Sequence, residues 1–256
     1  MVRFPESVKR IGNGAFADCI RLKSVDLPSA RTKIESSLFE GCKNLEKVTI
    51  PNGITEFEQR CFSECANLKS IDIPVGVTKI GDGAFEKCSS LTSVVLPNTV
   101  IDIGTSGTYK ECKNLEYINI PDGVVRIPAD AFRECSSLQR IIIPDSVTTI
   151  GKAAFSRCIG LQEVQLSDNL QFIDEYIFDD CSNLEIIVLP TSISTIGQYA
   201  FSDCTNLTMA IIPGDNIIGI SYGAFRNCRN LTIYGTPGTY PETYANENKI
   251  PFAIIQ

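Results

Sequence analysis

Cysteine is the residue through which this chain could most readily do chemistry, because a thiol can form a disulfide, bind a metal ion or act as a nucleophile. Ten of the 11 cysteines recur every 23 residues, with two steps of 24. They stand at positions 19, 42, 65, 88, 112, 135, 158, 181, 204 and 228. A fixed period of this length is typical of a solenoid, in which each unit buries its apolar face only against its neighbours.

The spacing argues against all three thiol chemistries. Zinc sites need closely paired ligands such as Cys-x-x-Cys, often with histidine, and the chain has neither that spacing nor any histidine. The missing histidine also removes the usual general base of a catalytic nucleophile. Equivalent cysteines in stacked coils would lie about 4.8 Å apart with parallel Cβ bonds, which disfavours disulfides. We therefore expect a column of buried, reduced thiols that fit a tight interior without needing any bond.

Cys61 is the one cysteine outside the repeat, four residues before Cys65. On a helical turn the two sulfur atoms could approach, which would allow a redox or metal role. Leu38 and Ile177 occupy the same place in their own repeats, so the sequence favours a tolerant core position.

Acidic residues precede six of the repeated cysteines, and such a column could in principle attract calcium. They are Asp18, Glu64, Glu111, Glu134, Asp180 and Asp203. Calcium requires several oxygen ligands that converge on one point, so a solvated face is the favoured interpretation. We predict no catalytic residue, no metal site and no cofactor.

The charge of the chain excludes several classes of partner. The formal net charge is −7, and the 23 Lys and Arg residues are scattered and form no basic stripe. We therefore expect no binding to nucleic acid or to anionic membranes. No apolar run approaches the roughly 18 residues of a membrane span, so we expect no membrane insertion.

The residues between the cysteines indicate the elements that position them. The segment Leu68-Lys-Ser-Ile-Asp-Ile73 alternates as a half-buried strand does, and proline follows at position 74. Stacked once per repeat, such strands would form a parallel sheet. The next stretch, Val-x-x-Ile-Gly, favours a second short ladder, and Ala-Phe-x-x-Cys favours a helical or 3₁₀ turn.

A row of aromatic rings is expected along the core. Tyr109 occupies one repeat, and phenylalanine occupies the same position in the other nine. The phenylalanines are at 16, 39, 62, 85, 132, 155, 178, 201 and 225. Stacked once per coil, the rings would make offset contacts.

Alternation along each strand places the residues two and four positions after the repeat leucine on the outer surface of the sheet. This rule predicts a polar surface in the first half of the chain and an apolar one in the second, and it includes Ile233. The residues predicted to bind a partner are Tyr117, Arg140, Ile142, Ile186, Val188, Met209 and Ile211. Exposed apolar patches usually mark an interface. Coverage by the C-terminal tail and an ordinary apolar surface are the alternatives.

The regular period stops after Gly235. Thr239-Tyr-Pro-Glu242 matches a capping box with proline near the helix start, which predicts a short helix through about Asn248. The segment Ile250-Pro-Phe-Ala-Ile-Ile255 would then close the apolar end of the stack.

The repeat resembles the BspA-type leucine-rich repeat. An example is Cys135-Ser-Ser-Leu-Gln-Arg-Ile-Ile-Ile-Pro-Asp-Ser-Val-Thr-Thr-Ile-Gly-Lys-Ala-Ala-Phe-Ser-Arg-Cys158, and the resemblance covers about nine tenths of the chain. It implies an α/β fold, a right-handed leucine-rich-repeat solenoid of about ten repeats over residues 1–234 that starts inside a repeat, with a cap over residues 235–256. Arg31, where Val or Ile is expected, departs from the pattern. So do two added residues, one between Gly104 and Tyr109 and one between Pro213 and Ile217.

The resemblance also implies a function. The family is associated with surface-displayed or secreted bacterial proteins that adhere to host proteins or other cells. We therefore expect a non-enzymatic protein-binding module, at the cell surface or secreted, whose partner is a host or extracellular matrix protein. One alternative is a structural array that associates with its own copies through the apolar sheet face or the N-terminal edge. Another is a cytoplasmic scaffold, which reduced cysteines would suit.

Overall fold

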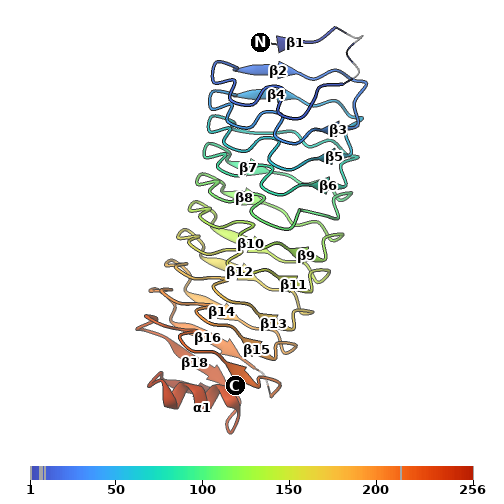
Figure 1. Ribbon diagram of the computed structural model, residues 1–256. Coiled ribbons are helices and arrows are strands. Elements are labelled where there is room, and N and C mark those ends of the chain that lie inside the picture. Colours follow the sequence, from blue (N-terminus) through green and yellow to red (C-terminus); the bar gives the residue numbers. More distant parts are fainter. Residues whose placement is uncertain (1, 6–7, 9, 214, 256) are drawn as a thin grey trace.

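The computed structural model describes residues 2–5, 8, 10–213 and 215–255. Its coils stack along one axis, and two ladders of short strands run along different sides of the stack (Figure 1). Paired strands are parallel, and within the repeats their partner residues stand 23 or 24 positions apart. The predicted leucine-rich-repeat solenoid of about ten 23-residue coils, with a parallel sheet and a second short ladder, is confirmed.

The strands are two to four residues long. The first ladder contains β1 (Val2–Arg3), β2 (Ser24–Asp26), β4 (Lys47–Thr49), β7 (Ser93–Val94), β8 (Tyr117–Ile118), β10 (Arg140–Ile142), β12 (Glu163–Gln165), β14 (Ile186–Val188), β16 (Met209–Ile212), β18 (Thr232–Gly235) and β19 (Phe252–Ile254). The second contains β3 (Lys33–Ile34), β5 (Glu56–Phe57), β6 (Lys79–Ile80), β9 (Arg126–Ile127), β11 (Thr149–Ile150), β13 (Phe172–Ile173), β15 (Thr195–Ile196) and β17 (Gly219–Ile220).

The segment before each cysteine differs from the predicted helical or 3₁₀ turn. The amide of Glu86 donates within its coil to the Gly83 carbonyl at 3.0 Å, whereas the amides of Phe85 and Lys87 donate to the following coil at 2.9 and 2.7 Å. In a helix all of these amides would bond along the helix itself. Here a chain of tight turns sends alternate amides along the stack, so the turns also tie neighbouring coils together.

This alternation requires a left-handed backbone at two positions in every coil, five residues and one residue before the cysteine. Glycine adopts that conformation freely, but most of these positions hold other residues, such as Arg60 and Ala153 with φ of 55° and 56°. The left-handed conformation costs a non-glycine residue roughly 1–2 kcal/mol. The hydrogen bonds to the next coil hold these residues in place.

The interior contains the expected row of rings. Nine successive ring pairs, from Phe16 through Tyr109 to Phe225, are stacked with centroids 5.2 to 5.6 Å apart and ring planes within 19° of parallel. Tyr109 takes the place of phenylalanine without interrupting the row. The prediction from the repeat is therefore confirmed.

The cysteine column is buried as predicted, but its thiols do form bonds. All 11 cysteines are free, and Cys19 alone among them is half-buried while the others are buried. The thiol of Cys88 donates to the Phe62 carbonyl of the preceding coil at 3.1 Å, and Cys158 donates in the same way to Phe132 at 3.1 Å. Equivalent bonds recur from Cys42 to Cys228.

Most aromatic carbonyls in this column accept two hydrogen bonds. The Phe62 carbonyl accepts from the amide of Cys65 in its own coil at 3.1 Å, besides the thiol of Cys88 in the next. A carbonyl has two acceptor sites, and leaving one unpaired in a dry interior is costly. The cysteine is therefore a small apolar side chain that also satisfies the backbone.

Burial keeps these thiols protonated. It raises the pKa of Cys88 and Cys158 to about 12, an effect that the backbone of the preceding cysteine opposes only in part. A thiol that stays protonated keeps its S–H donor and is a poor nucleophile, because the thiolate is the reactive form.

Helix α1 spans Tyr240–Glu247 with Thr239 as its N-cap, so the short helix predicted for the tail is confirmed and ends just before Asn248. The reciprocal bonds of a capping box are not formed. Thr239 makes no side-chain capping bond, and the Glu242 carboxylate accepts from the amide of Gly238 at 2.7 Å.

Arg31, which departs from the repeat pattern, is buried at the edge of the core. Its guanidinium forms an ion pair with Glu35 and donates to the Lys33 carbonyl at 3.3 Å. Burial lowers its pKa. The coil thus accepts a charged side chain in an apolar column by pairing it locally.

Adjacent alanines test the cost of the left-handed positions. Ala153 has a φ of 56° and its neighbour Ala154 is fully buried. We expect Ala153→Gly to raise the free energy of unfolding by roughly 0.5–1 kcal/mol, because glycine adopts this conformation without strain. Ala154→Gly, the matched control, should lower it, since it removes a buried methyl group and adds chain entropy. Urea denaturation measures both, and destabilisation by Ala153→Gly would contradict the strain argument.

The thiol column predicts instability in alkali. The pKa of the Cys158 thiol is raised from an ordinary 9.0 to about 12. The contribution of this thiol to the free energy of unfolding is therefore complete below pH 9 and is lost as the pH rises from 9 through 12. Each such thiol should make the free energy of unfolding fall by about 1.4 kcal/mol per pH unit in that window. Urea denaturation from pH 8 to 10.5 measures the slope.

Two variants identify the source of that slope. Cys158→Ala should make the slope shallower by about 1.4 kcal/mol per pH unit, the share of one thiol. Leu161→Ala removes a buried side chain of the same coil without removing a thiol, so it should lower stability and keep the slope. Equal slopes in the two variants would show that the thiols are not responsible.

Candidate functional site

Cys61 has no access to solvent. Its side chain is fully buried, and burial raises its pKa well above the ordinary value of a thiol. It therefore packs as a core residue and is poorly suited to redox or nucleophilic chemistry. Within the described ranges, no group of three or more His, Cys, Asp or Glu side chains is placed to hold a metal ion.

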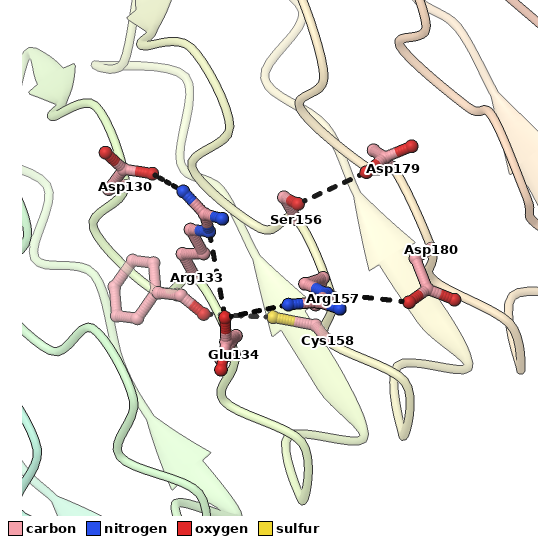
Figure 2. Close-up of polar contacts among 9 residues, drawn as sticks. Asp130, Arg133, Glu134, Ser156, Arg157, Cys158, Asp179 and Asp180 are labelled. Carbon is pink, nitrogen blue, oxygen red and sulfur yellow. Dashed lines mark hydrogen bonds and ion pairs between the residues drawn. The ribbon is translucent and has the colours of Figure 1, made fainter.

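The acidic column lies along the turn edge of the stack, where its residues adopt the left-handed backbone. Figure 2 shows how it is paired: Glu134 lies 3.2 Å from Arg157 and 3.9 Å from Arg133, and Arg157 lies 3.8 Å from Asp180 in the next coil. Exposed ion pairs of this kind contribute little stability each. The carboxylates are spread along the stack between cations, which fits the solvated face favoured by the sequence.

The predicted partner-binding residues all lie on the outward side of the first ladder. Four large apolar residues are strongly exposed: Tyr117 at 55%, Ile142 at 46%, Ile186 at 47% and Val188 at 52%. Arg140 is exposed, and Met209 and Ile211 are half-buried.

The structure divides these residues into two groups. Ile186 and Val188 of β14 pair with Met209 and Ile211 of β16, and the four side chains form what we call the apolar patch. On the other side of β12, Tyr117, Arg140 and Ile142 line what we call the face groove, of about 460 Å³. Glu163 and Gln165 of β12 separate the two groups, so the residues do not form one continuous surface.

The face groove lies at one of the places where strand pairing in the first ladder is interrupted. Strands β8 and β10 lie next to each other, yet the described residues show no strand pairing between them. The groove is mixed in charge, because Glu116 and Asp122 line it together with Arg140. Arg140 itself lies 3.3 Å from Glu163 on the far side.

The prediction for Ile233 is wrong, because this side chain is fully buried. Met209 pairs with Thr232, and Ile233 pairs with the buried Ala210. The last coil has one residue fewer between its leucine and its strand, and a one-residue slip turns every side chain to the other face of a sheet. The local alternation of Thr232, Ile233 and Tyr234 already indicates that Ile233 points inward. The prediction was wrong because it counted positions from the repeat leucine.

The tail extends the sheet and does not fold over the apolar patch. Strand β19 pairs with β18 in parallel, and Ile254 is 62% exposed. With Ile211 and Tyr234, it lines a shallow groove at the end of the sheet. The sequence rule missed Tyr234 and Ile254, which continue the apolar surface to the last strand. The alternative that the C-terminal tail covers the patch is excluded for Val188.

Among the described residues, the structure contains no helix with the length and apolar character that a membrane span requires.

Comparison with family models identifies the repeat. The model of the BspA type leucine-rich repeat region, which holds six copies, matches residues 1–111 and 105–232. The two matches together cover most of the chain. A comparison with curated proteins gave no match.

Several solved structures share the fold. A leucine-rich cell surface protein from Faecalibacterium prausnitzii is 30% identical with a TM-score of 0.60, and the match covers 93% of this chain and 66% of that one, just under two thirds. The leucine-rich repeat protein of T. pallidum is 29% identical with a TM-score of 0.58, over 62% of this chain and 77% of that one. A leucine-rich repeat protein from Eubacterium ventriosum, 21% identical with a TM-score of 0.53, covers 94% and 78% and shows the fold alone.

Proposed function

The chain belongs to the BspA-type leucine-rich repeat family, and from that premise we propose that it is a non-enzymatic protein-binding module displayed on a bacterial cell surface. The Faecalibacterium protein, described as a leucine-rich cell surface protein, supports the location. The apolar patch is the observation that carries the binding role. The partner is a protein whose own contact surface is apolar at its centre, and host or extracellular matrix proteins are the class to test first.

The apolar patch is suited to binding because it is already ordered. Strands β14, β16, β18 and β19 form one hydrogen-bonded sheet, so their backbone is fixed before a partner arrives. Ile186 and Val188 are β-branched and about half exposed. Such side chains lose little rotamer freedom on contact, which reduces the cost of association. The polar Glu163 and Gln165 beside them provide part of a rim.

The free cysteines do not conflict with a location outside the cell. The accessible thiols of exported proteins are usually oxidised. Oxidation requires a thiolate and access to an oxidant. The thiols of Cys88, Cys112 and Cys135 are fully buried, and burial raises their pKa. The fold protects these buried thiols in either compartment, which removes the main argument for the cytoplasmic scaffold.

The double variant Ile186→Glu plus Ile211→Glu tests the proposal. Placing two carboxylates in the apolar patch should reduce capture of extracellular matrix proteins in a pull-down at least tenfold, because a buried unpaired charge costs several kcal/mol. Ser70→Glu plus Ser93→Glu is the matched control, since both residues are exposed and pair with each other on the same face, several coils away from the apolar patch. Equal capture by the two variants would exclude the apolar patch as the binding surface, and no capture by the wild type would count against an adhesion role.

A second candidate function is association between copies of this chain. The apolar patch runs to the exposed Ile254 on β19, the last strand of the ladder, and a self-complementary patch of this kind can pair two subunits. Under the first proposal we expect the wild type and the Ile186→Glu plus Ile211→Glu variant to sediment as monomers at all concentrations. A concentration-dependent dimer in the wild type that the variant lacks would favour self-association instead.

A further inference from the structure

The last coil leaves a row of backbone N–H groups without the coil that would accept from them. In earlier coils, the equivalent amides of Tyr176, Phe201 and Asp203 donate to a carbonyl of the following coil at 3.1, 2.8 and 2.8 Å. The corresponding amides of the last coil belong to Gly223, Phe225 and Asn227. No backbone carbonyl of the described residues accepts from these three.

The cap covers only the middle of this row. The ring of Tyr244 in α1 packs edge-on against Phe225 with centroids 6.2 Å apart. Burial raises the pKa of Tyr244, and the nearby backbone of Phe225 opposes the shift. The amides of Gly223 and Asn227 on either side are left without a described acceptor, and both residues have the left-handed backbone, with φ of 68° and 62°.

These two residues line a pocket at the end of the stack. The pocket measures about 430 Å³ and lies between the last coil and the segment that follows α1. Its cationic side chains are Arg226, Arg229 and Lys249, and no carboxylate of a described residue lines it. This gathering of positive charge contrasts with a chain of net charge −7.

The three cations differ in how far they are already engaged. Arg226 lies 6.0 Å from the ring centre of Tyr199. It also lies near Asp203, whose pKa is lowered by hydrogen bonds from Ser202 and Asn227 and then by the charge of Arg226. Arg229 and Lys249 are exposed and form no ion pair with another described residue. They are therefore the charges that a ligand can use.

We propose that this end pocket binds an oxyanion, a sulfate, phosphate or carboxylate group carried by a ligand. Backbone N–H groups presented from left-handed turns form concave sites suited to anions, and nearby cations strengthen them. The amide of Gly223 or that of Asn227 donates to the oxyanion, while Arg229 and Lys249 offset its charge. Tyr222, 77% exposed at the rim of the pocket, offers a ring face to the rest of the ligand. The end pocket is separate from the apolar patch and does not depend on the protein-binding role.

The test is an NMR titration of the ¹⁵N-labelled chain with sodium sulfate, sodium phosphate and sodium glucuronate, each replacing sodium chloride at constant ionic strength. We expect the amide signals of Gly223 and Asn227 to shift and to saturate with at least one of the three anions. Saturation with sulfate or phosphate alone supports a mineral or ester oxyanion. Saturation with glucuronate, weakened by Tyr222→Ser, supports an acidic sugar.

Charge variants show whether the pocket is the site. Arg229→Gln and Lys249→Gln should each weaken binding up to about fivefold, the range expected for one exposed charge. Both side chains are exposed, so the variants should fold. Arg140→Gln, which removes a charge from the sheet face, should leave binding unchanged. Three results would overturn the proposal. The first is shifts that never saturate, and the second is an affinity that Arg229→Gln and Lys249→Gln leave unchanged. The third is signals of Gly223 and Asn227 that move with protein concentration alone, which would assign these amides to end-to-end contact between copies of the chain.

Discussion

The carbonyl of the core aromatic residue is the group on which the rest of the structure depends. This polar atom lies in a dry interior, where an unpaired acceptor site is costly, and in most coils it has two donors. The Cys65 amide supplies one to Phe62 and the Cys88 thiol of the next coil supplies the other. Valine would fill the space without donating, and serine would bury a more polar group. Cysteine meets both needs, which accounts for its recurrence once per coil.

Satisfying that carbonyl fixes the geometry around it. The thiol reaches the preceding coil only if the coils are stacked in register, and that register brings the rings of Phe132 and Phe155 to 5.2 Å. The turns must also send alternate amides along the stack, which forces left-handed backbone even on Tyr176 and Tyr199. The outward side chains of the first ladder take no part in this network. They are free to vary from coil to coil, and this freedom lets an apolar patch form on one part of a regular sheet.

The period alone predicted the parallel ladders, the ring row and the buried thiols, because each depends on which side chains face inward. It did not predict the thiol bonds or the tight turns, since apolar spacing says nothing about where an amide points: Ala84, Phe85 and Cys88 have the same spacing in a 3₁₀ turn and in the observed turns. On the sheet face, alternation located Ile186 and Val188 correctly. It failed at Ile233, where the shortened last coil no longer followed the repeat. The end pocket was beyond the reach of the sequence, because its central groups are backbone amides.

The apolar patch and the end pocket therefore differ in how they can change. The patch consists of side chains such as Ile186 and Val188 that the fold does not need, so substitutions can alter its specificity at little cost in stability. The amides of Gly223 and Asn227 exist because the stack ends, and any solenoid with this turn geometry exposes the same row at its last coil. In this chain the cap covers the Phe225 amide with Tyr244 and leaves its neighbours beside Arg229 and Lys249. Selectivity at the end pocket must then come from the cap and these cations, while the sheet face can vary independently.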